Sequence, residues 1–465
     1  MEQLTNLLNQ LSGYLYAPYA LPALLVGAGA YLTYQTGFVQ IRHFGTAVKE
    51  ALSGMFAGKE GKGEGTITSF QALTTALAST VGNGNIGGVA TAIIVGGPGA
   101  IFWMWVTAAV GMATKYSEAV LGVHYRVTTE SGEFASGPMY YITNGLKEKP
   151  YAKPLAYMFC VFGAATALFG TGNMAQSNTI AQTFRQAAQQ NFDLDVHPLI
   201  PGLLITVACG LVLLGGIKRI AMVSEKLVPS MIVVYMLMGL VYVVMNVGEI
   251  PAVFGVIFSN AFTPMAAVGG FVGAGVSQAI AAGISRGVLS NEAGLGSAPI
   301  AHGIAKVSHP VQQGLVGVFE VFVDTIVVCS MTAFIIISSG MWQLAEFQQS
   351  SGDLTAAALD AQMPGASLLV ALCSFLFGFS TLIGWCYYGE KCFEFMFGTK
   401  GIVPYRFIYT ALILVGAVVP VPIVWAIGTL LNGFMAFPNL IGLIGLGGVV
   451  AKLTKEYFNG ERTTS

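Results

Sequence analysis

The chain has 465 residues, of which 54% are hydrophobic and only 9% are charged, and its mean hydropathy is +0.70. Soluble domains carry about 25% charged residues. This composition therefore excludes a soluble cofactor domain and indicates a membrane protein with several spans in the lipid bilayer. The net charge of −1 points to no nucleic-acid partner, and the distribution of the charges along the chain is more informative than their sum.

Eleven apolar segments follow one another along the chain, and each is long enough for the roughly 20 residues of a membrane-spanning helix. Joints rich in proline and glycine separate several of them. The predicted helices are 18–36, 68–95, 98–126, 152–188, 198–216, 224–247, 266–306, 311–341, 366–395, 402–419 and 421–452. We therefore expect an all-helical integral membrane protein.

The basic residues support this division, because cytoplasmic loops contain an excess of lysine and arginine. Eighteen of the 21 basic residues fall in alternate loops and in the tail, so these segments share one side. Loops on the other side, such as 348–362, carry acidic residues and no lysine or arginine. The pattern predicts an N-terminus outside the cell and a cytoplasmic C-terminal tail at 453–465.

The chain ends and the cysteines carry less information. The segment MEQLTNLLNQLSGY has no basic residue before an apolar stretch, so no cleavable signal peptide is expected there. The cysteines form no C-x-x-C pair and predict buried small side chains rather than a metal site or a disulfide framework. They are Cys160, Cys209, Cys329, Cys373, Cys386 and Cys392.

The predicted helix 68–95 contains STVGNGNIGG, in which Gly82, Gly84 and Gly87 fit G-x-G-x-x-G. A dinucleotide-binding loop needs a preceding strand and an acidic residue about twenty positions later. No charged residue occurs between positions 65 and 114, so a nucleotide cofactor is excluded. Polar groups at mid-membrane depth instead favour a helix interrupted at a binding site. The alternative is that these glycines only allow close helix packing.

A second irregular segment lies five helices later, where 283–299 reads GISRGVLSNEAGLGSAP. Transporters built from inverted repeats interrupt helices at corresponding places in their two halves. We therefore expect one repeat at 68–247 and an inverted one at 266–452, with a peripheral helix and a basic loop at 1–67. The two interruptions then face each other near the bilayer midplane.

Three motifs make the chain resemble the alanine or glycine:cation symporter family. They are GGPGAIFWMWVTAAVGMATKYSEAVL at 96–121, SNEAGLGSAPI at 290–300 and STLIGWCYYGEKC at 380–392, and the resemblance extends from 37 to 452. It implies the leucine-transporter-like five-plus-five inverted repeat of the amino acid-polyamine-organocation superfamily, with one extra N-terminal helix. It also implies sodium-coupled uptake of alanine or glycine, in some members D-alanine, across the inner membrane, without a cofactor.

A zwitterionic substrate needs donors for its carboxylate and acceptors for its ammonium group. Free N–H groups at a helix N-terminus suit the carboxylate. The ammonium group can bind freed carbonyl groups and the Gln176 side chain, which matches a family position thought to face the substrate; alternatively, Gln176 only bonds neighbouring helices. The predicted substrate-binding residues are Thr80, Asn83, Gly84, Asn85, Gln176, Ala282, Gly283, Gly287 and Asn291.

For sodium, the resemblance implies a site between the first interrupted helix and the third helix of the second repeat. Sodium binds hard oxygen ligands, which hydroxyl and carbonyl groups provide. The predicted ligands are the carbonyl groups of Ala78 and Val81 and the hydroxyl groups of Ser380 and Thr381. As an alternative, a membrane serine or threonine often only bonds a carbonyl group of its own helix.

Several charged residues remain within the predicted spans. Arg286 is expected to pair with Glu292, Glu320 or Asp324, and Lys115 with Glu118 three residues later. Glu292 also keeps open a proton-coupled symporter of the same fold. A channel is a more distant alternative, because the polar residues do not form a continuous lining. No catalytic constellation indicates an enzyme, and no protein partner is predicted.

Overall fold

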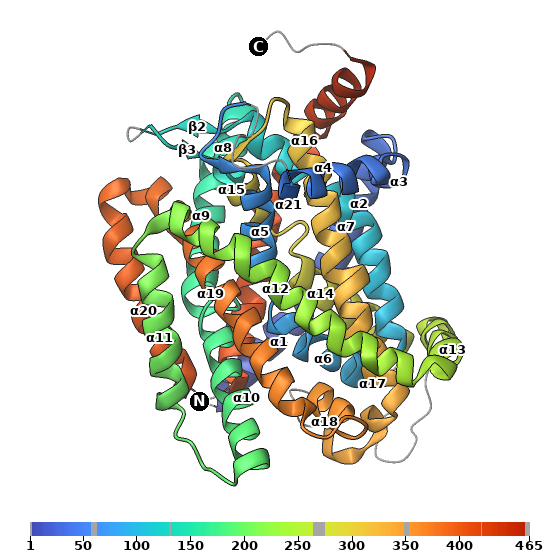
Figure 1. The fold of residues 1–465 in the computed structure, drawn as a ribbon. Coiled ribbons are helices and arrows are strands. Elements are labelled where there is room, and N and C mark those ends of the chain that lie inside the picture. The colour runs from blue at the N-terminus through green and yellow to red at the C-terminus, as the bar shows by residue number, and fades with distance from the viewer. Residues whose placement is uncertain are drawn as a thin grey trace.

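The structure is a computed structural model that describes residues 2–56, 63–129, 132–263, 275–347, 353–419 and 421–460. Its helices form one bundle (Figure 1). The strands β2 (Val127–Thr128) and β3 (Phe134–Ala135), helix α8 (Pro138–Gly145) and the C-terminal end of α21 (Val421–Asn459) lie at one end of the bundle, which we call the β end. Helix α18 (Leu354–Asp360) marks the opposite end, the α18 end. The expected all-helical class is confirmed, apart from four two-residue strands among these residues.

The N-terminal region contains more helices than the sequence predicts. Helix α2 (Leu21–Gln35) corresponds to the predicted span 18–36. Helices α1 (Glu2–Leu15), α3 (Val39–Arg42) and α4 (Phe44–Phe56) were not expected. These three are short, and α1 and α4 are amphipathic, so a search for long apolar segments does not detect them.

The first predicted interruption is present. Strand β1 (Ile67–Thr68) leads into α5 (Ser69–Thr80), and the short 3-10 turn η1 (Asn83–Asn85) separates it from α6 (Gly87–Gly96). A reciprocal pair of hydrogen bonds between Thr68 and Gln71 caps the start of α5. Helix α7 (Gly99–His124) follows as predicted.

The predicted continuous helix 152–188 is wrong, because the chain divides it into α9 (Ala152–Phe169) and α10 (Met174–Phe192). The joint lies where other helices approach very closely: a Cβ on Gly172 would lie 2.7 Å from the Trp385 side chain. The following elements are α11 (Leu199–Leu213), α12 (Gly216–Met245), the turn η2 (Val247–Glu249) and the unpredicted α13 (Ile250–Phe262).

The second predicted interruption is present as well, between α14 (Val276–Asn291) and α15 (Ala298–His302). The start of the predicted helix 266–306 lies outside the described residues. Strand β4 (Ala305–Lys306) leads to α16 (Pro310–Val321), which continues through the π-helical segment η3 (Phe322–Cys329) into α17 (Ser330–Ser339). The remaining elements are η4 (Met341–Gln343), η5 (Ala345–Phe347), α18, α19 (Ala366–Phe397), η6 (Thr399–Gly401), α20 (Ile402–Val418) and α21 (Val421–Asn459).

The two interrupted helices run in opposite directions. Strand β1, just before α5, pairs in parallel with β4, which follows α15, with Ile67 opposite Ala305. The first interrupted helix therefore begins where the second one ends. This arrangement is the one that inverted repeats require, while the repeat boundaries at 68–247 and 266–452 stay a prediction.

Within the described chain, six helical segments are long and apolar enough to cross a membrane, and the first of them joins α9 and α10 across their joint. They are Ala152–Phe192, Gly216–Met245, Pro310–Ser339, Ala366–Phe397, Thr399–Val418 and Ile423–Asn459. Two shorter apolar helices are Leu199–Leu213 and Val247–Phe262. The interrupted helices consist of shorter pieces that such a length criterion does not recognise. The chain is thus a multi-pass membrane protein, as expected.

The basic loops gather near one another, as the sequence pattern requires. Arg126, after α7, donates to the carbonyl oxygens of Glu64 and Ala305 at 2.9 Å. Lys218, at the start of α12, lies 3.8 Å from Glu133 beside the β2–β3 pair. These contacts join three of the basic loops at the β end.

Candidate functional site

The break between α5 and α6 redirects the backbone hydrogen bonds of the chain. The N–H of Gly82 donates to the Asn85 side chain at 2.9 Å, and the N–H of Asn83 donates to Gln176 Oε1 at 3.4 Å. The N–H of Asn85 bonds the carbonyl oxygen of Gly82 at 3.0 Å. The carbonyl groups of Ala78, Ser79 and Val81 therefore lose the N–H partners that a continuous helix provides.

Side chains from two other helices hold Asn83 in this break. Its amide nitrogen donates to Gln176 Oε1 at 3.1 Å, and its Oδ1 accepts from Ser374 of α19 at 2.7 Å. Gln176 in turn donates to the carbonyl oxygen of Thr171 at 3.0 Å. Gln176 thus does bond neighbouring segments, and its side chain also borders a cavity described below.

Asn85 joins the first break to the π-helical segment. Its amide nitrogen donates to Asp324 Oδ1 at 2.6 Å, and Asp324 Oδ2 accepts from Ser290 and Thr325, each at 2.8 Å. The carbonyl oxygen of Asn85 accepts from Thr332 at 2.8 Å. Asn85 and Asp324 are fully buried, so this cluster fixes the break from the side away from solvent.

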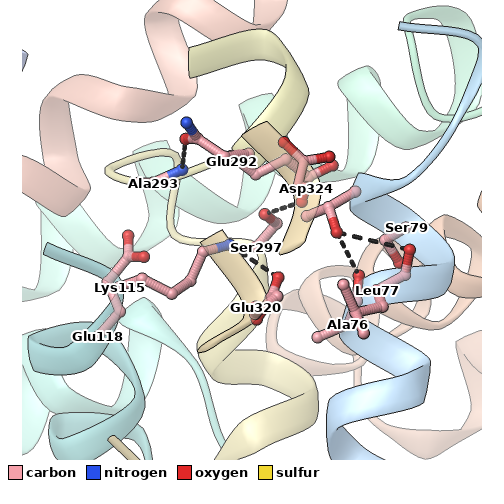
Figure 2. A network of polar contacts seen from close by, with 12 residues as sticks. Ala76, Leu77, Ser79, Lys115, Glu118, Glu292, Ala293, Ser297, Glu320 and Asp324 are labelled. Carbon is pink, nitrogen blue, oxygen red and sulfur yellow. Dashed lines mark hydrogen bonds and ion pairs between the residues drawn. The ribbon is translucent and has the colours of Figure 1, made fainter. Parts of the chain in front are cut away.

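Buried carboxylates hold the second break, which Figure 2 shows together with its surroundings. Glu292 ends α14 with a φ of 58° and accepts hydrogen bonds from Ser297 at 2.5 Å and Trp385 Nε1 at 2.8 Å. Glu118 Oε1 accepts from the N–H groups of Gly294 and Gly296 at 3.2 and 3.0 Å. It also accepts from the Asn439 side chain at 2.6 Å.

The expected pair between Lys115 and Glu118 does not form. Lys115 reaches from α7 to Glu320 of α16 at 3.2 Å (Figure 2), while Glu118 turns toward the glycine amides of the second break. Glu320 also contacts His302 at 2.6 Å, and His302 contacts Gln313 at 2.7 Å. This fully buried chain of polar groups joins α7, α15 and α16. The prediction from sequence spacing is wrong because Lys115 and Glu118 each have a closer partner on another element.

The expected pairing of Arg286 with an acidic residue is also absent. The seven ion pairs within 4 Å in the described part of the chain do not include Arg286. Its three proposed partners are occupied by other groups: Glu292 by Ser297 and Trp385, Glu320 by Lys115, and Asp324 by neutral donors. Arg286 is half-buried and borders two cavities.

A small cavity of about 30 Å³ lies between the two breaks. Thr80 and Gly84 of the first break, Gln176 of α10 and Thr381 of α19 border it, all of them predicted site residues. A larger cavity of about 330 Å³ extends from Asn83 and Arg286 past α10 to α18. Gly88, Arg286 and Trp425 line both, so the two spaces adjoin one another.

The other predicted substrate residues lie away from the small cavity. Asn85 and Asn291 are fully buried, and Asn291 bonds Thr325 and the N–H of Ala293. Ala282, Gly283 and Gly287 face α6 and α7: a Cβ on Gly283 would lie 2.3 Å from the carbonyl oxygen of Ala100. In this conformation these residues position the helices that carry the site.

Of the four predicted sodium ligands, Thr381 lies beside the first break. Ser380 and Thr381 donate to the carbonyl oxygen of Phe377 at 2.8 and 2.9 Å, which is the local bonding expected as the alternative. Thr381 Oγ1 nevertheless lies 2.6 Å from the position that a Cβ on Gly82 would occupy. Ala78 and Val81 are fully buried in the same region, so the four predicted ligands belong to two adjacent helices.

Several residues that line the small cavity were not predicted. They include Ser79, Thr171, Ser290, Trp385 and Trp425. Thr171 lies in the joint between α9 and α10, and its polar surroundings GTGNMAQSNT were the signal available in the sequence. Trp385 and Trp425 resemble ordinary apolar residues of a membrane helix, so only the packing of helices distant in sequence reveals them.

Comparison with known proteins adds the identity of the family. The sodium:alanine symporter family matches the chain over residues 1–465. The sodium/alanine symporter AgcS of Methanococcus maripaludis is 48% identical over 453 residues, which cover 97% of each chain. The putative sodium/proton-dependent alanine carrier protein YrbD of Bacillus subtilis is 37% identical, over 93% of this chain and 88% of that protein.

Among solved structures, a Na+-coupled sialic acid symporter in a substrate-bound outward-open state superposes with a TM-score of 0.48. Its sequence identity is 12%, over 94% of this chain and 86% of the other. The family assignment rests on the sequence matches, which extend along nearly the whole chain. The chain belongs to the sodium:alanine symporter family and is a membrane transporter, not an enzyme.

Proposed function

We propose that the chain imports a small neutral amino acid, alanine or glycine, including D-alanine, together with sodium. The observation that carries this proposal is the small cavity between two interrupted helices, bordered by Thr80, Gly84, Gln176 and Thr381. Interrupted membrane helices expose N–H and carbonyl groups that bind ions and zwitterions. The family membership and the name of the sodium/alanine symporter from Methanococcus maripaludis support alanine and sodium.

Sodium is proposed to bind where α19 approaches the end of α5. The carbonyl groups of Ala78 and Val81 have lost their helical N–H partners, since Gly82 and Asn85 donate elsewhere. The hydroxyl groups of Ser380 and Thr381 complete a set of oxygen ligands, with Thr381 adjacent to the break. Hydroxyl oxygens that donate to a carbonyl group keep lone pairs that can coordinate a cation.

The substrate is proposed to bind with its carboxylate at the N–H group of Gly84 and its ammonium group near Thr80 and Gln176. The N–H groups of Asn83 and Asn85 already donate to Gln176 Oε1 and to the carbonyl oxygen of Gly82, so they reach the carboxylate only if those bonds break. The volume of the small cavity favours the smallest side chains, those of alanine and glycine. In this proposal, the second interrupted helix contributes to the substrate site through Ala282, Gly283, Gly287 and Asn291 of α14. Its carbonyl groups face the substrate only when α14 moves relative to α7.

The orientation and the transport cycle follow from the charge pattern. If the basic β end is cytoplasmic, the α18 end and the large cavity face the outside of the cytoplasmic (inner) membrane. The proposed architecture has eleven spans, with the repeats 68–247 and 266–452 inverted relative to one another. Sodium binding would favour one conformation of the first break, and this differential affinity couples the ion to the substrate.

The test is uptake of labelled alanine and glycine into proteoliposomes with an inward sodium gradient or with choline. We expect the wild-type chain to accumulate substrate only with sodium, and the double variant Ser380→Ala, Thr381→Ala to lose at least about tenfold in uptake, corresponding to 1.4 kcal/mol. Thr410→Ala is the matched control, because its hydroxyl bonds a carbonyl group of its own helix at 2.8 Å but lines neither cavity. Equal uptake by all three proteins would refute the ion site.

Proton coupling is a second candidate, favoured by Glu292. This carboxylate borders the small cavity and, among the residues that the structure describes, accepts hydrogen bonds from the neutral side chains of Ser297 and Trp385. The name of the related Bacillus subtilis carrier includes both sodium and protons. Uptake that persists in choline, follows a proton gradient and is lost in Glu292→Gln would replace sodium with protons in this proposal.

A further inference from the structure

The large cavity has the size and lining of a binding site of its own. Its volume of about 330 Å³ lies within the range of about 300–1,000 Å³ typical of ligand sites. The small cavity, at about 30 Å³, lies far below that range. In this conformation, the large cavity therefore has more room for an amino acid.

Two charged side chains of opposite sign line the large cavity. Arg286 of α14 lies at its inner part, which adjoins the small cavity, and Asp353 lies just before α18. The other described lining residues are neutral and include Gln182, Gln186 and Gln190, spaced one helical turn apart on α10. The lining thus combines one cation, one carboxylate and several amide groups.

Arg286 carries a charge that nothing in the described chain neutralises at close range. Among the described residues, it belongs to none of the ion pairs within 4 Å. An arginine side chain stays protonated in proteins. Charged residues within membrane proteins are costly and mark substrate pathways when they face a cavity.

Asp353 is likewise half-buried without a cationic partner in an ion pair. The side chain of Gln186 donates a hydrogen bond to it. Burial raises the pKa of the Asp353 carboxyl group above its ordinary value, and the Gln186 bond opposes this shift. A cationic group entering the cavity would therefore stabilise the ionised carboxylate.

We propose that the large cavity binds an amino-acid zwitterion, with its carboxylate on Arg286 and its ammonium group turned toward the part of the cavity that holds Asp353. Arginine binds carboxylates through two parallel hydrogen bonds, which neither a lone amide nor a lysine reproduces. Because Arg286 also lines the small cavity, it can hold the carboxylate until the amino acid moves to the first break. This inference deepens the proposed function and rests on it for the identity of the ligand.

This site differs from the proposed transport site in its dependence on sodium and on side-chain size. Its lining includes none of Ala78, Val81, Ser380 and Thr381, so its occupancy does not require sodium. The greater volume admits side chains larger than that of alanine. We therefore expect weak, sodium-independent binding of neutral amino acids, and displacement of alanine by glutamine.

The experiment measures binding of labelled alanine to the purified full-length chain in lipid nanodiscs, in sodium and in choline. In choline, we expect weak binding to the wild-type chain, a loss of at least about tenfold in affinity, or about 1.4 kcal/mol, in Arg286→Gln, and a smaller loss in Asp353→Asn. Arg185→Gln is the matched control, because Arg185 pairs with exposed Asp195 and lines neither cavity. Arg286→Lys should restore part of the affinity, which a misfolded variant would not do.

The two parts of the hypothesis can fail separately. Equal binding in choline by the wild-type chain and Arg286→Gln, or no binding by the wild-type chain at millimolar alanine, would overturn the large-cavity site. Loss of the sodium-dependent component from Ser380→Ala, Thr381→Ala with retention of the choline component would support both sites. Absence of a sodium-dependent component from the wild-type chain would refute sodium coupling, and the choline measurements would still decide the role of Arg286.

Discussion

The two interrupted helices are held open by different chemistry. Around the first break, between α5 and α6, the groups that bond its side chains belong to Gln176, Ser374 and Asp324 on other helices. The second break, between α14 and α15, itself contains a carboxylate, Glu292, and depends on a second one, Glu118. The first break leaves carbonyl groups at the end of α5 without helical N–H partners, whereas in the second break the N–H groups of Gly294 and Gly296 are occupied by Glu118. The first break therefore suits ligand binding, and the second suits a structural role.

The largest effect is expected from removing the carboxylate that supports the second break. Glu118→Ala would leave the N–H groups of Gly294 and Gly296 and the Asn439 amide without this acceptor. Each unsatisfied buried donor costs about 1–3 kcal/mol. We expect a large decrease in the thermal unfolding midpoint in detergent and a smaller one for Glu118→Gln, which keeps an acceptor oxygen. An unchanged midpoint for Glu118→Ala would contradict the structural role of the second break.

A smaller loss of stability but a large loss of transport is expected from Asn85→Ala. This change removes the acceptor of the Gly82 N–H and one donor to Asp324, while Ser290 and Thr325 still donate to that carboxylate. We expect sodium-driven uptake to fall by at least about tenfold, the equivalent of 1.4 kcal/mol. Asn246→Ala, which breaks an exposed amide pair with Gln362, is the control and should transport normally. Normal uptake by Asn85→Ala would show that transport does not depend on the contacts that Asn85 makes in the first break.

Substitutions at two glycines of the first break distinguish an effect on helix packing from an effect on ligand access. A Cβ on Gly82 would lie 2.6 Å from Thr381 Oγ1, whereas a Cβ on Gly84 meets no atom within 4 Å. We expect Gly82→Ala to lower both the unfolding midpoint and sodium affinity, because the hydroxyl must move. Gly84→Ala should fold normally and weaken substrate binding alone, since the methyl group enters the small cavity. Identical effects of the two substitutions on both measurements would contradict this division.

The smallest effect is expected for a charge outside both breaks. Lys218 and Glu133 form an exposed ion pair at 3.8 Å at the β end. Exposed pairs contribute about 0.2–1 kcal/mol, and salt screens them. We expect Lys218→Gln to leave both uptake and the unfolding midpoint nearly unchanged. A loss as large as that of Asn85→Ala would show that transport depends on the β end as strongly as on the first break.

The interruptions could be predicted because their signal is local. Glycine and asparagine beside one another in a long apolar segment are unfavourable in a continuous helix and costly in lipid. The same signal was present at GTGN, residues 170–173, but the adjoining residues continue a helical pattern on both sides. The helix is interrupted there because Trp385 approaches Gly172 closely, and Trp385 belongs to a helix more than 200 positions later in the chain.

The partners of the charged residues could not be predicted, because they depend on packing between distant segments. Lys115 and Glu118 have ideal spacing for a pair on one helix, yet each side chain meets a partner on another element. The alternating basic loops did indicate which loops lie together, since that pattern reflects the number of spans. The sequence therefore predicts the fold class and the two breaks, while the buried polar network requires the three-dimensional structure.

The parallel pairing of β1 with β4 has a consequence for the transport cycle. Its hydrogen bonds include the N–H of Thr66 to the carbonyl oxygen of Ile304 at 2.8 Å, and they connect the start of one interrupted helix to the end of the other. If the chain opens toward the β end, either these bonds break or both helices move together. Deuterium exchange at the Thr66 and Ile67 amides distinguishes the two, because broken bonds expose these amides to solvent in each cycle. The exchange rate of these two amides would therefore report how often the much larger helical bundle opens.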